Sequence, residues 1–191
     1  MKQDIILAGV GGQGILSIAT IIGEAATSAG VNLKQAEVHG MSQRGGDVQS
    51  NLRLSNEPIW SDLIPTGQAD MILAMEPMEA LRYVPFLSRT GWIVTSSASF
   101  VNIPNYPHRQ ELLKELDSYP NVLKLDIEDI AAKAGSPKSA NMVLLGMAAP
   151  LLKILSPEEL RLAVARVFAS KGDAVVENNL KAFDAGMEAK R

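Results

Sequence analysis

A glycine-rich segment near the start of the chain has the residue types needed to hold an anion. It matches the pattern G-x-G-x-x-G, and the residues expected to line a ligand are Gly9, Gly11, Gly12, Gln13 and Gly14. Glycine permits a tight turn and brings backbone N–H groups close to a bound anion. Because the pattern follows a short apolar run and opens a helical periodicity, a helix N-terminus adds partial positive charge. This chemistry suits a phosphate or a pyrophosphate.

A dinucleotide site requires more than the turn, since an acid at the end of the second strand usually accepts the ribose hydroxyls. The nearest acid is Glu37, and its strand is unusually polar, with Asn32, Lys34 and Gln35. Three interpretations therefore stand. The glycines bind no ligand and only allow tight strand–turn–helix packing, or they bind a phosphate-bearing ligand, or they form a full dinucleotide site.

A second segment with specific residue types follows the second expected strand. Its residues are His39, Gly40, Met41, Ser42, Gln43, Arg44, Gly45 and Gly46. The carboxyl ends of strands in an open α/β sheet form the binding crevice, and a guanidinium such as that of Arg44 binds carboxylate or phosphate through two parallel hydrogen bonds. We expect a substrate or interface loop here, with an ordinary solvated loop as the alternative.

Three further residue types could take part in binding, nucleophilic catalysis or metal ligation. Asn141 begins an apolar helix, where it either caps the helix or reaches into the crevice. The segment Ser96-Ser97-Ala98-Ser99 comes at a strand end without an elbow pattern or an evident base, which favours a polar strand end over a nucleophile. His39 and His108 are the only histidines, and neither has a partner at metal-ligand spacing, so we expect no metal site.

Strands and helices alternate through most of the chain. Apolar runs predict strands at 5–8, 31–38, 48–54, 71–75, 92–96 and 122–125, and helical periodicity predicts helices at 15–29, 78–86, 110–116, 127–134, 139–154, 157–169 and 173–188. This alternation predicts an α/β, Rossmann-like, three-layer domain with a mostly parallel sheet. The helical C-terminal third is expected to lie across the sheet or to extend one edge.

Composition limits the class of protein. The 191 residues are 47% hydrophobic and 20% charged, which is typical of a globular chain, and we expect one domain over 1–191. A net charge of −3 gives no reason to expect nucleic acid or an acidic membrane as a partner. The absence of cysteine excludes disulfides and cysteine-ligated clusters. No signal peptide or membrane-length apolar run is evident, so the expected location is cytoplasmic.

Three segments together carry a resemblance to a known family. GVGGQG at the first turn, EVHGMSQRGGDV at the second loop and SANMVLLGMAAP at 139–150 resemble the gamma-type module of the 2-oxoacid:ferredoxin oxidoreductases. The likeness extends over most of the chain. The second loop is similar to that of the indolepyruvate branch, in which the module is a separate chain, the beta subunit.

The resemblance implies a division of labour between subunits. The family oxidatively decarboxylates a 2-oxoacid on thiamine diphosphate, passes electrons through iron–sulfur clusters to ferredoxin, and releases an acyl-CoA. Thiamine diphosphate, magnesium and the clusters belong to a larger alpha subunit, so this chain alone is expected to bind no cofactor and to be inactive. The glycine turn and Arg44 are then the candidates for the phosphates of CoA.

Two hypotheses of different class follow. In the first, the chain is a subunit that completes the oxidoreductase and meets ferredoxin only indirectly. Without its partner, an exposed apolar face would allow the isolated chain to form a homodimer. In the second, it is an independent nucleotide- or phosphate-ligand-binding protein that uses the glycine-rich turn. A large partner rich in cysteine favours the first, and saturable dinucleotide binding by the isolated chain favours the second.

Overall fold

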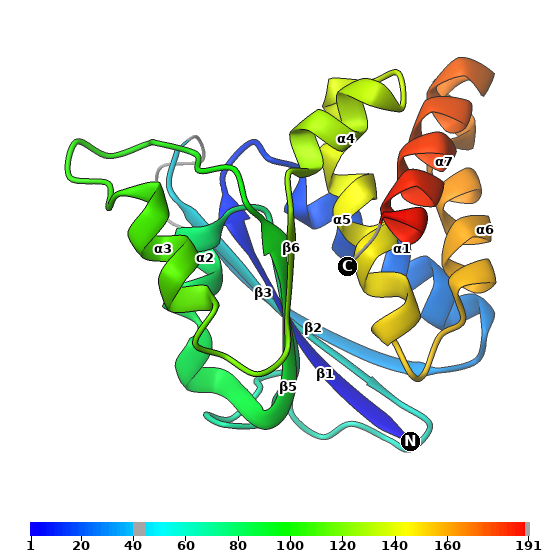
Figure 1. Ribbon diagram of the computed structural model, residues 1–191. Helices are drawn as coiled ribbons and strands as arrows, with labels where there is room; N and C mark the ends of the chain where they lie inside the picture. The colour runs from blue at the N-terminus through cyan, green and yellow to red at the C-terminus, as the bar shows by residue number, and fades with distance from the viewer. Residues whose placement is uncertain (40–44, 190–191) are drawn as a thin grey trace.

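A computed structural model describes residues 1–39 and 45–189, and a six-stranded sheet runs through them in the order β2-β3-β1-β4-β5-β6 (Figure 1). The strands are β1 (Lys2–Val10), β2 (Asn32–His39), β3 (Asp47–Ser55), β4 (Ala69–Ala74), β5 (Leu87–Ser96) and β6 (Val122–Leu125). β1, β4, β5 and β6 pair in parallel, whereas β3 is antiparallel to both of its neighbours. The connection from β2 to β3 is too short for a crossover, which dictates an antiparallel pair. The expected mostly parallel sheet is confirmed.

Helices cover both faces of this sheet and complete the expected three layers. The helices are α1 (Ile15–Ser28), α2 (Pro77–Arg82), α3 (Arg109–Leu116), α4 (Ile127–Lys133), α5 (Ala140–Ala148), α6 (Pro157–Phe168) and α7 (Asp173–Glu188). Figure 1 shows α2 and α3 on one face, with α1 and α4 to α7 on the other. The helical C-terminal third therefore lies across one face of the sheet and does not extend its edge.

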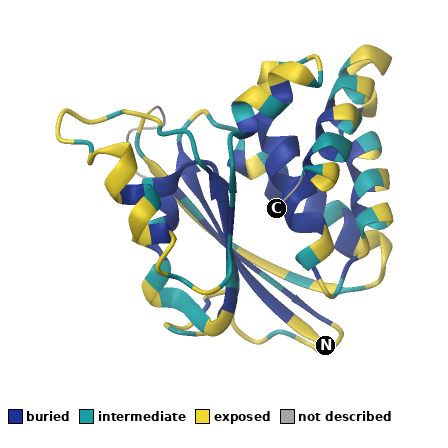
Figure 2. Cartoon of the chain, viewed as in Figure 1, coloured by how far each residue is buried: buried dark blue, intermediate teal, exposed yellow. Residues whose placement is uncertain are grey.

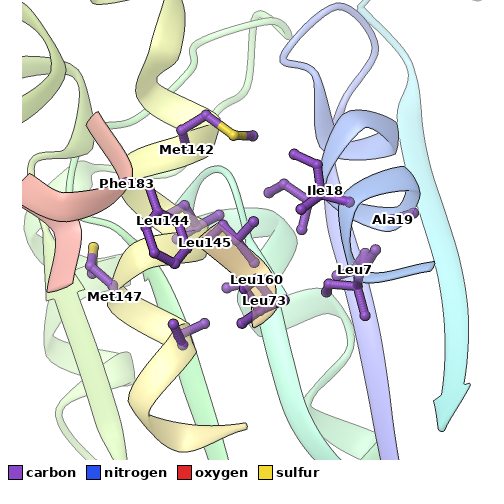
Figure 3. Packing of buried hydrophobic residues seen from close by; sticks show 14 of the residues in the cluster. Leu7, Ile18, Ala19, Leu73, Met142, Leu144, Leu145, Met147, Leu160 and Phe183 are labelled. Carbon is purple, nitrogen blue, oxygen red and sulfur yellow. The ribbon is translucent and has the colours of Figure 1, made fainter. Parts of the chain in front are cut away.

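The core forms because side chains alternate between the two faces of each strand. In β1, Ile5 and Leu7 join the cluster under α1 and α5, whereas Ile6 and Ala8 join the cluster under α2. All four side chains are fully buried, as expected for a strand covered on both sides. Figure 2 shows this burial along the sheet, and Figure 3 shows part of the larger cluster, with Leu7 drawn beside Ile18 and Ala19 of α1.

The C-terminal helices differ from expectation at one point. The helix expected over 139–154 ends at Ala148, and a single 3-10 turn, Ala149–Leu151, follows. Pro150 explains the shorter helix, since proline lacks an N–H and its ring clashes with the carbonyl four residues earlier. By contrast, α6 begins as expected, with Ser156 and Glu159 forming a reciprocal capping box.

Candidate functional site

The two loops singled out in the sequence meet at the carboxyl end of β1. The Gly11 N–H donates to the carbonyl of Gly46 at 2.8 Å, and the Gly45 N–H donates to the carbonyl of Gly11 at 3.4 Å. A third loop, which follows β5, joins them, because the Asn102 side-chain amide donates to the carbonyl of Gly45 at 2.9 Å. Three connections distant in sequence thus share one edge of the sheet, where the crevice of an open α/β sheet forms.

The glycine-rich turn is closed from within by Gln13. Its side-chain Oε1 accepts a hydrogen bond from the Val10 N–H at 2.7 Å, and its own N–H donates to the Val10 carbonyl at 3.1 Å. Gly12 and Gly14 have φ values of 103° and 81°, in the left-handed region that favours glycine. Gln13 therefore shapes the turn, and its Oε1 is engaged in that turn.

Asn141 links the turn to the C-terminal helices. Its Nδ2 donates to the carbonyl of Gly14 at 3.1 Å, although 127 positions separate the two residues. Asn141 does not cap α5, because the N-cap is Ser139. A Cβ on Gly14 would lie 2.8 Å from this Nδ2, so the contact as well as the backbone angle requires glycine. The structure thus excludes the cap and gives Asn141 a structural contact with the turn, while its role as a substrate or interface residue stays a prediction.

Two hollows of similar size flank the turn. The lysine pocket, with a volume of about 450 Å³, lies toward the C-terminal helices and includes Gly14, Ser17, Lys138, Asn141, Lys171 and Asn178. The strand pocket, of about 430 Å³, lies toward β2 and β3 and includes Val10, Ile15, Leu16, Glu37 and Val48. The turn therefore separates a basic, polar pocket from a mainly apolar pocket that carries an acid.

The strand order weakens the dinucleotide interpretation. Glu37 does line a pocket beside the turn. However, β3 lies between β1 and β2 in the sheet. Glu37, on β2, is therefore two strands away from β1 and not on the strand next to it. This displaces its carboxylate by one strand spacing, about 4.8 Å, from the place that the acid takes when the first two strands pair directly.

A comparison with family models assigns the chain. The model for pyruvate ferredoxin/flavodoxin oxidoreductase matches residues 4–189. The chain belongs to this family. The resemblance noted in the first turn, the second loop and the helix at 139–150 is thereby confirmed.

The chain is similar both to separate subunits and to part of a longer chain in this family. The chain is 36% identical to the indolepyruvate oxidoreductase subunit IorB of Archaeoglobus fulgidus, over 97% of this chain and 94% of that protein. It is 28% identical to the ketoisovalerate oxidoreductase subunit VorA of Methanothermobacter thermautotrophicus, over 95% of this chain but only 35% of the longer protein. It also matches the crystal structure of a keto/oxoacid ferredoxin oxidoreductase gamma subunit from Geobacter sulfurreducens, with a TM-score of 0.70, 29% identity and coverage of 97% and 96% of the two chains.

Part of the expected site falls outside the described residues. These residues are Gly40, Met41, Ser42, Gln43 and Arg44. The backbone of His39 pairs with Val48 at the end of β2. Sequence reasoning missed Lys138 and Lys171, and the available signal was weak, since both are isolated lysines beside helix starts.

The same edge of the sheet holds a buried carboxyl that the sequence did not reveal. Glu76, which follows β4 and is the N-cap of α2, is fully buried. It accepts hydrogen bonds from the Glu79 N–H at 2.5 Å and from the Tyr106 hydroxyl. Burial raises the pKa of Glu76. Because this carboxyl binds the start of α2 and the loop after β5, it fixes that loop where it meets Gly45.

Ser96 makes two hydrogen bonds at the end of β5. The Ser96 hydroxyl donates to Glu128 at 2.9 Å and accepts from the Ala98 N–H at 3.0 Å, in agreement with a polar strand end. Burial raises the pKa of Glu128. Among the side chains that the structure describes, no three of His, Asp or Glu gather as a metal site would require. No helix in the described part of the chain is long and apolar enough to cross a membrane.

Proposed function

We propose that this chain is the small subunit of a 2-oxoacid:ferredoxin oxidoreductase acting on indolepyruvate or another aryl 2-oxoacid. The complex would form an acyl-CoA and transfer electrons to ferredoxin, with this chain inactive alone. The observation that carries the proposal is the similarity to IorB, which spans nearly all of both chains. Residues 1–191 would then form a single gamma-type domain that completes a larger assembly.

The residues of this chain do not suit the redox cofactors of such an enzyme. The sequence has no cysteine to ligate an iron–sulfur cluster. We therefore assign the clusters, thiamine diphosphate and magnesium to a larger alpha subunit. This chain would contribute the edge of the sheet where its two loops meet, and it would help to shape the entrance for substrate or CoA. The turn Gly9 to Gly14 and Arg44 are the proposed contacts for CoA phosphates.

Co-purification from native extract tests the proposal. The tagged chain, isolated without oxygen, should bring down a larger chain in equal amount together with iron, sulfide and thiamine diphosphate. That complex should oxidise aryl 2-oxoacids faster than aliphatic ones in the presence of CoA and ferredoxin. If the chain purifies alone and no oxidoreductase activity is recovered when candidate subunits are added, the proposal is wrong.

An independent nucleotide-binding protein is the second candidate. The two pockets on either side of the turn favour it, because together they could take the phosphate and the base of one ligand. Saturable binding of NAD or FAD by the isolated chain, with no partner in the extract, would establish this alternative. Binding of neither dinucleotide would remove it.

A further inference from the structure

The lysine pocket has the side-chain chemistry of an anion site. Two cations, Lys138 and Lys171, line it together with serine hydroxyls and asparagine amides, and no carboxylate is among its lining residues. This composition is notable in a chain with 21 acids and 18 lysines and arginines, whose net charge is −3. The charge of the pocket is therefore opposite to that of the whole chain.

Neither lysine is neutralised by a carboxylate in the described part of the chain. The ion pairs there involve other cations, such as Lys133 with Asp129 and Lys181 with Glu177. Lys171 instead places its Nζ 5.1 Å from the ring centroid of Phe168, a contact that keeps its positive charge. Two unpaired ammonium groups at one pocket repel each other, and a bound anion would remove that repulsion.

The backbone of three helices supports the same charge. Residues of the pocket come from the first turns of α1 (Ser17), α5 (Asn141) and α7 (Val175). Each helix N-terminus carries partial positive charge, so the first turns of three helices in the lining add to the positive charge of the lysines.

Buried amides hold the walls of the pocket in place. Asn141 and Asn179 are only 8% and 7% exposed. Their Nδ2 groups donate to the carbonyls of Gly14 and Val175, at 3.1 Å and 2.8 Å. The Ser139 hydroxyl is also engaged, because it donates to Ser136 at 3.3 Å. The donors that can turn toward a ligand are therefore on the two lysines, Ser17 and Asn178. A site whose walls are already fixed loses little entropy when it binds.

We propose that the lysine pocket binds a phosphate ester group, with Lys138 and Lys171 as its cationic partners. The strand pocket does not suit an anion, because its lining is mainly apolar and its charged side chain is Glu37. The volume of about 450 Å³ exceeds that of one phosphate and suits a phosphorylated sugar. The identity of the carrier as CoA rests on the proposed function, whereas the phosphate site itself does not.

Calorimetric titration of the full chain at low salt tests the site. Inorganic phosphate, CoA and dephospho-CoA are the three probes, and the variants are Lys138→Ala and Lys171→Ala. Each should weaken the binding of CoA about five- to tenfold, the size expected for one charge-assisted contact at a partly exposed site. The matched control is Lys114→Ala, since Lys114 is an exposed lysine on α3 across the sheet, and it should bind as the parent does.

The three probes separate the sources of the phosphate. Tighter binding of CoA than of dephospho-CoA would support the site with the ribose phosphate as its ligand, and equal binding of both would support it with the diphosphate. Binding of inorganic phosphate alone, lost in both lysine variants, would show a site for the free anion and overturn the phosphate ester as its ligand. The proposal is overturned if no probe binds, or if the Lys138 and Lys171 variants bind like the Lys114 control.

Assembly provides a separate readout, so the two proposals can fail independently. If the tagged lysine variants still co-purify with the larger chain and keep the parent KM for CoA, the assignment of CoA to the pocket is wrong while the subunit assignment stands. If phosphate binding depends on both lysines but no larger chain is recovered, the pocket stands and the subunit assignment is wrong.

Discussion

Replacing Gly146 by alanine should force α5 and α7 apart. An added Cβ would lie 2.0 Å from the carbonyl oxygen of Phe183, 3.0 Å from its carbonyl carbon and 3.1 Å from the Met187 nitrogen. The crossing is reciprocal, because a Cβ on Gly186 would lie 2.1 Å from the carbonyl oxygen of Val143. Backbone atoms cannot turn aside as a flexible side chain can, so the helices themselves would have to move.

The size of this movement sets the loss of stability. Carbon–oxygen contacts of this kind settle at about 3.3 Å or more, so the backbones must separate by roughly 1.3 Å. A gap of that size forfeits half or more of the dispersion energy between facing atoms, and every residue of α5 is buried. We expect overpacking to cost about 3 kcal/mol, offset by about 1 kcal/mol of helix propensity. The net loss is about 2 kcal/mol, or roughly 4–8 °C in Tm.

Gly23→Ala is the matched control for this substitution. Gly23 also lies inside a helix, but its added Cβ would meet only the flexible end of Leu33, at 3.3 Å. This variant should gain up to about 1 kcal/mol from helix propensity. Urea unfolding monitored by circular dichroism measures both changes. If Gly146→Ala is as stable as the parent while Gly23→Ala behaves as expected, the close α5–α7 crossing is wrong.

Three further substitutions test other contacts. Arg53→Met removes the two hydrogen bonds, of 2.9 Å and 3.1 Å, that the guanidinium donates to the fully buried Asp4 carboxylate, and it leaves Lys2 as a cationic partner at 2.9 Å. It should lower the free energy of unfolding by about 3 kcal/mol in urea, and a loss below about 1 kcal/mol would contradict this pairing. Glu76→Gln should flatten the pH dependence of stability. Because the pKa of buried Glu76 is raised, the parent loses stability as pH rises from the ordinary glutamate pKa through the raised one. Urea unfolding at about pH 5 and about pH 8 should show a smaller loss of unfolding free energy in the variant than in the parent, and an equal loss would contradict this role of Glu76. Asn141→Ala removes the hydrogen bond to the Gly14 carbonyl and should cost about 1–2 kcal/mol, with faster amide exchange in the turn, and unchanged exchange there would argue against the link.

Local features of the sequence were sufficient for most elements. Helices and strands follow from the spacing of apolar residues over one or two turns, and the capping box of α6 follows from Ser156 and Glu159. The position of the glycine turn could be predicted for the same reason, since a strand, a turn and a helix adjoin in the chain. The error in the length of α5 was also local, because Pro150 lies inside the range predicted as helix and ends it.

The candidate site depended on contacts that no local pattern contains. The insertion of β3 between β1 and β2 moved Glu37 away from the place of a dinucleotide-binding acid, and strand order is set by long-range pairing. Lys138 lies just before α5 and Lys171 just before α7. Only the packing of these two helices against each other and near α1 brings both lysines to one pocket. The sequence by itself thus determined the elements, the turn and the family, because these reside in local spacing and motif. Tertiary structure alone decided which side of the turn carries positive charge, since that depends on which distant side chains the core brings together.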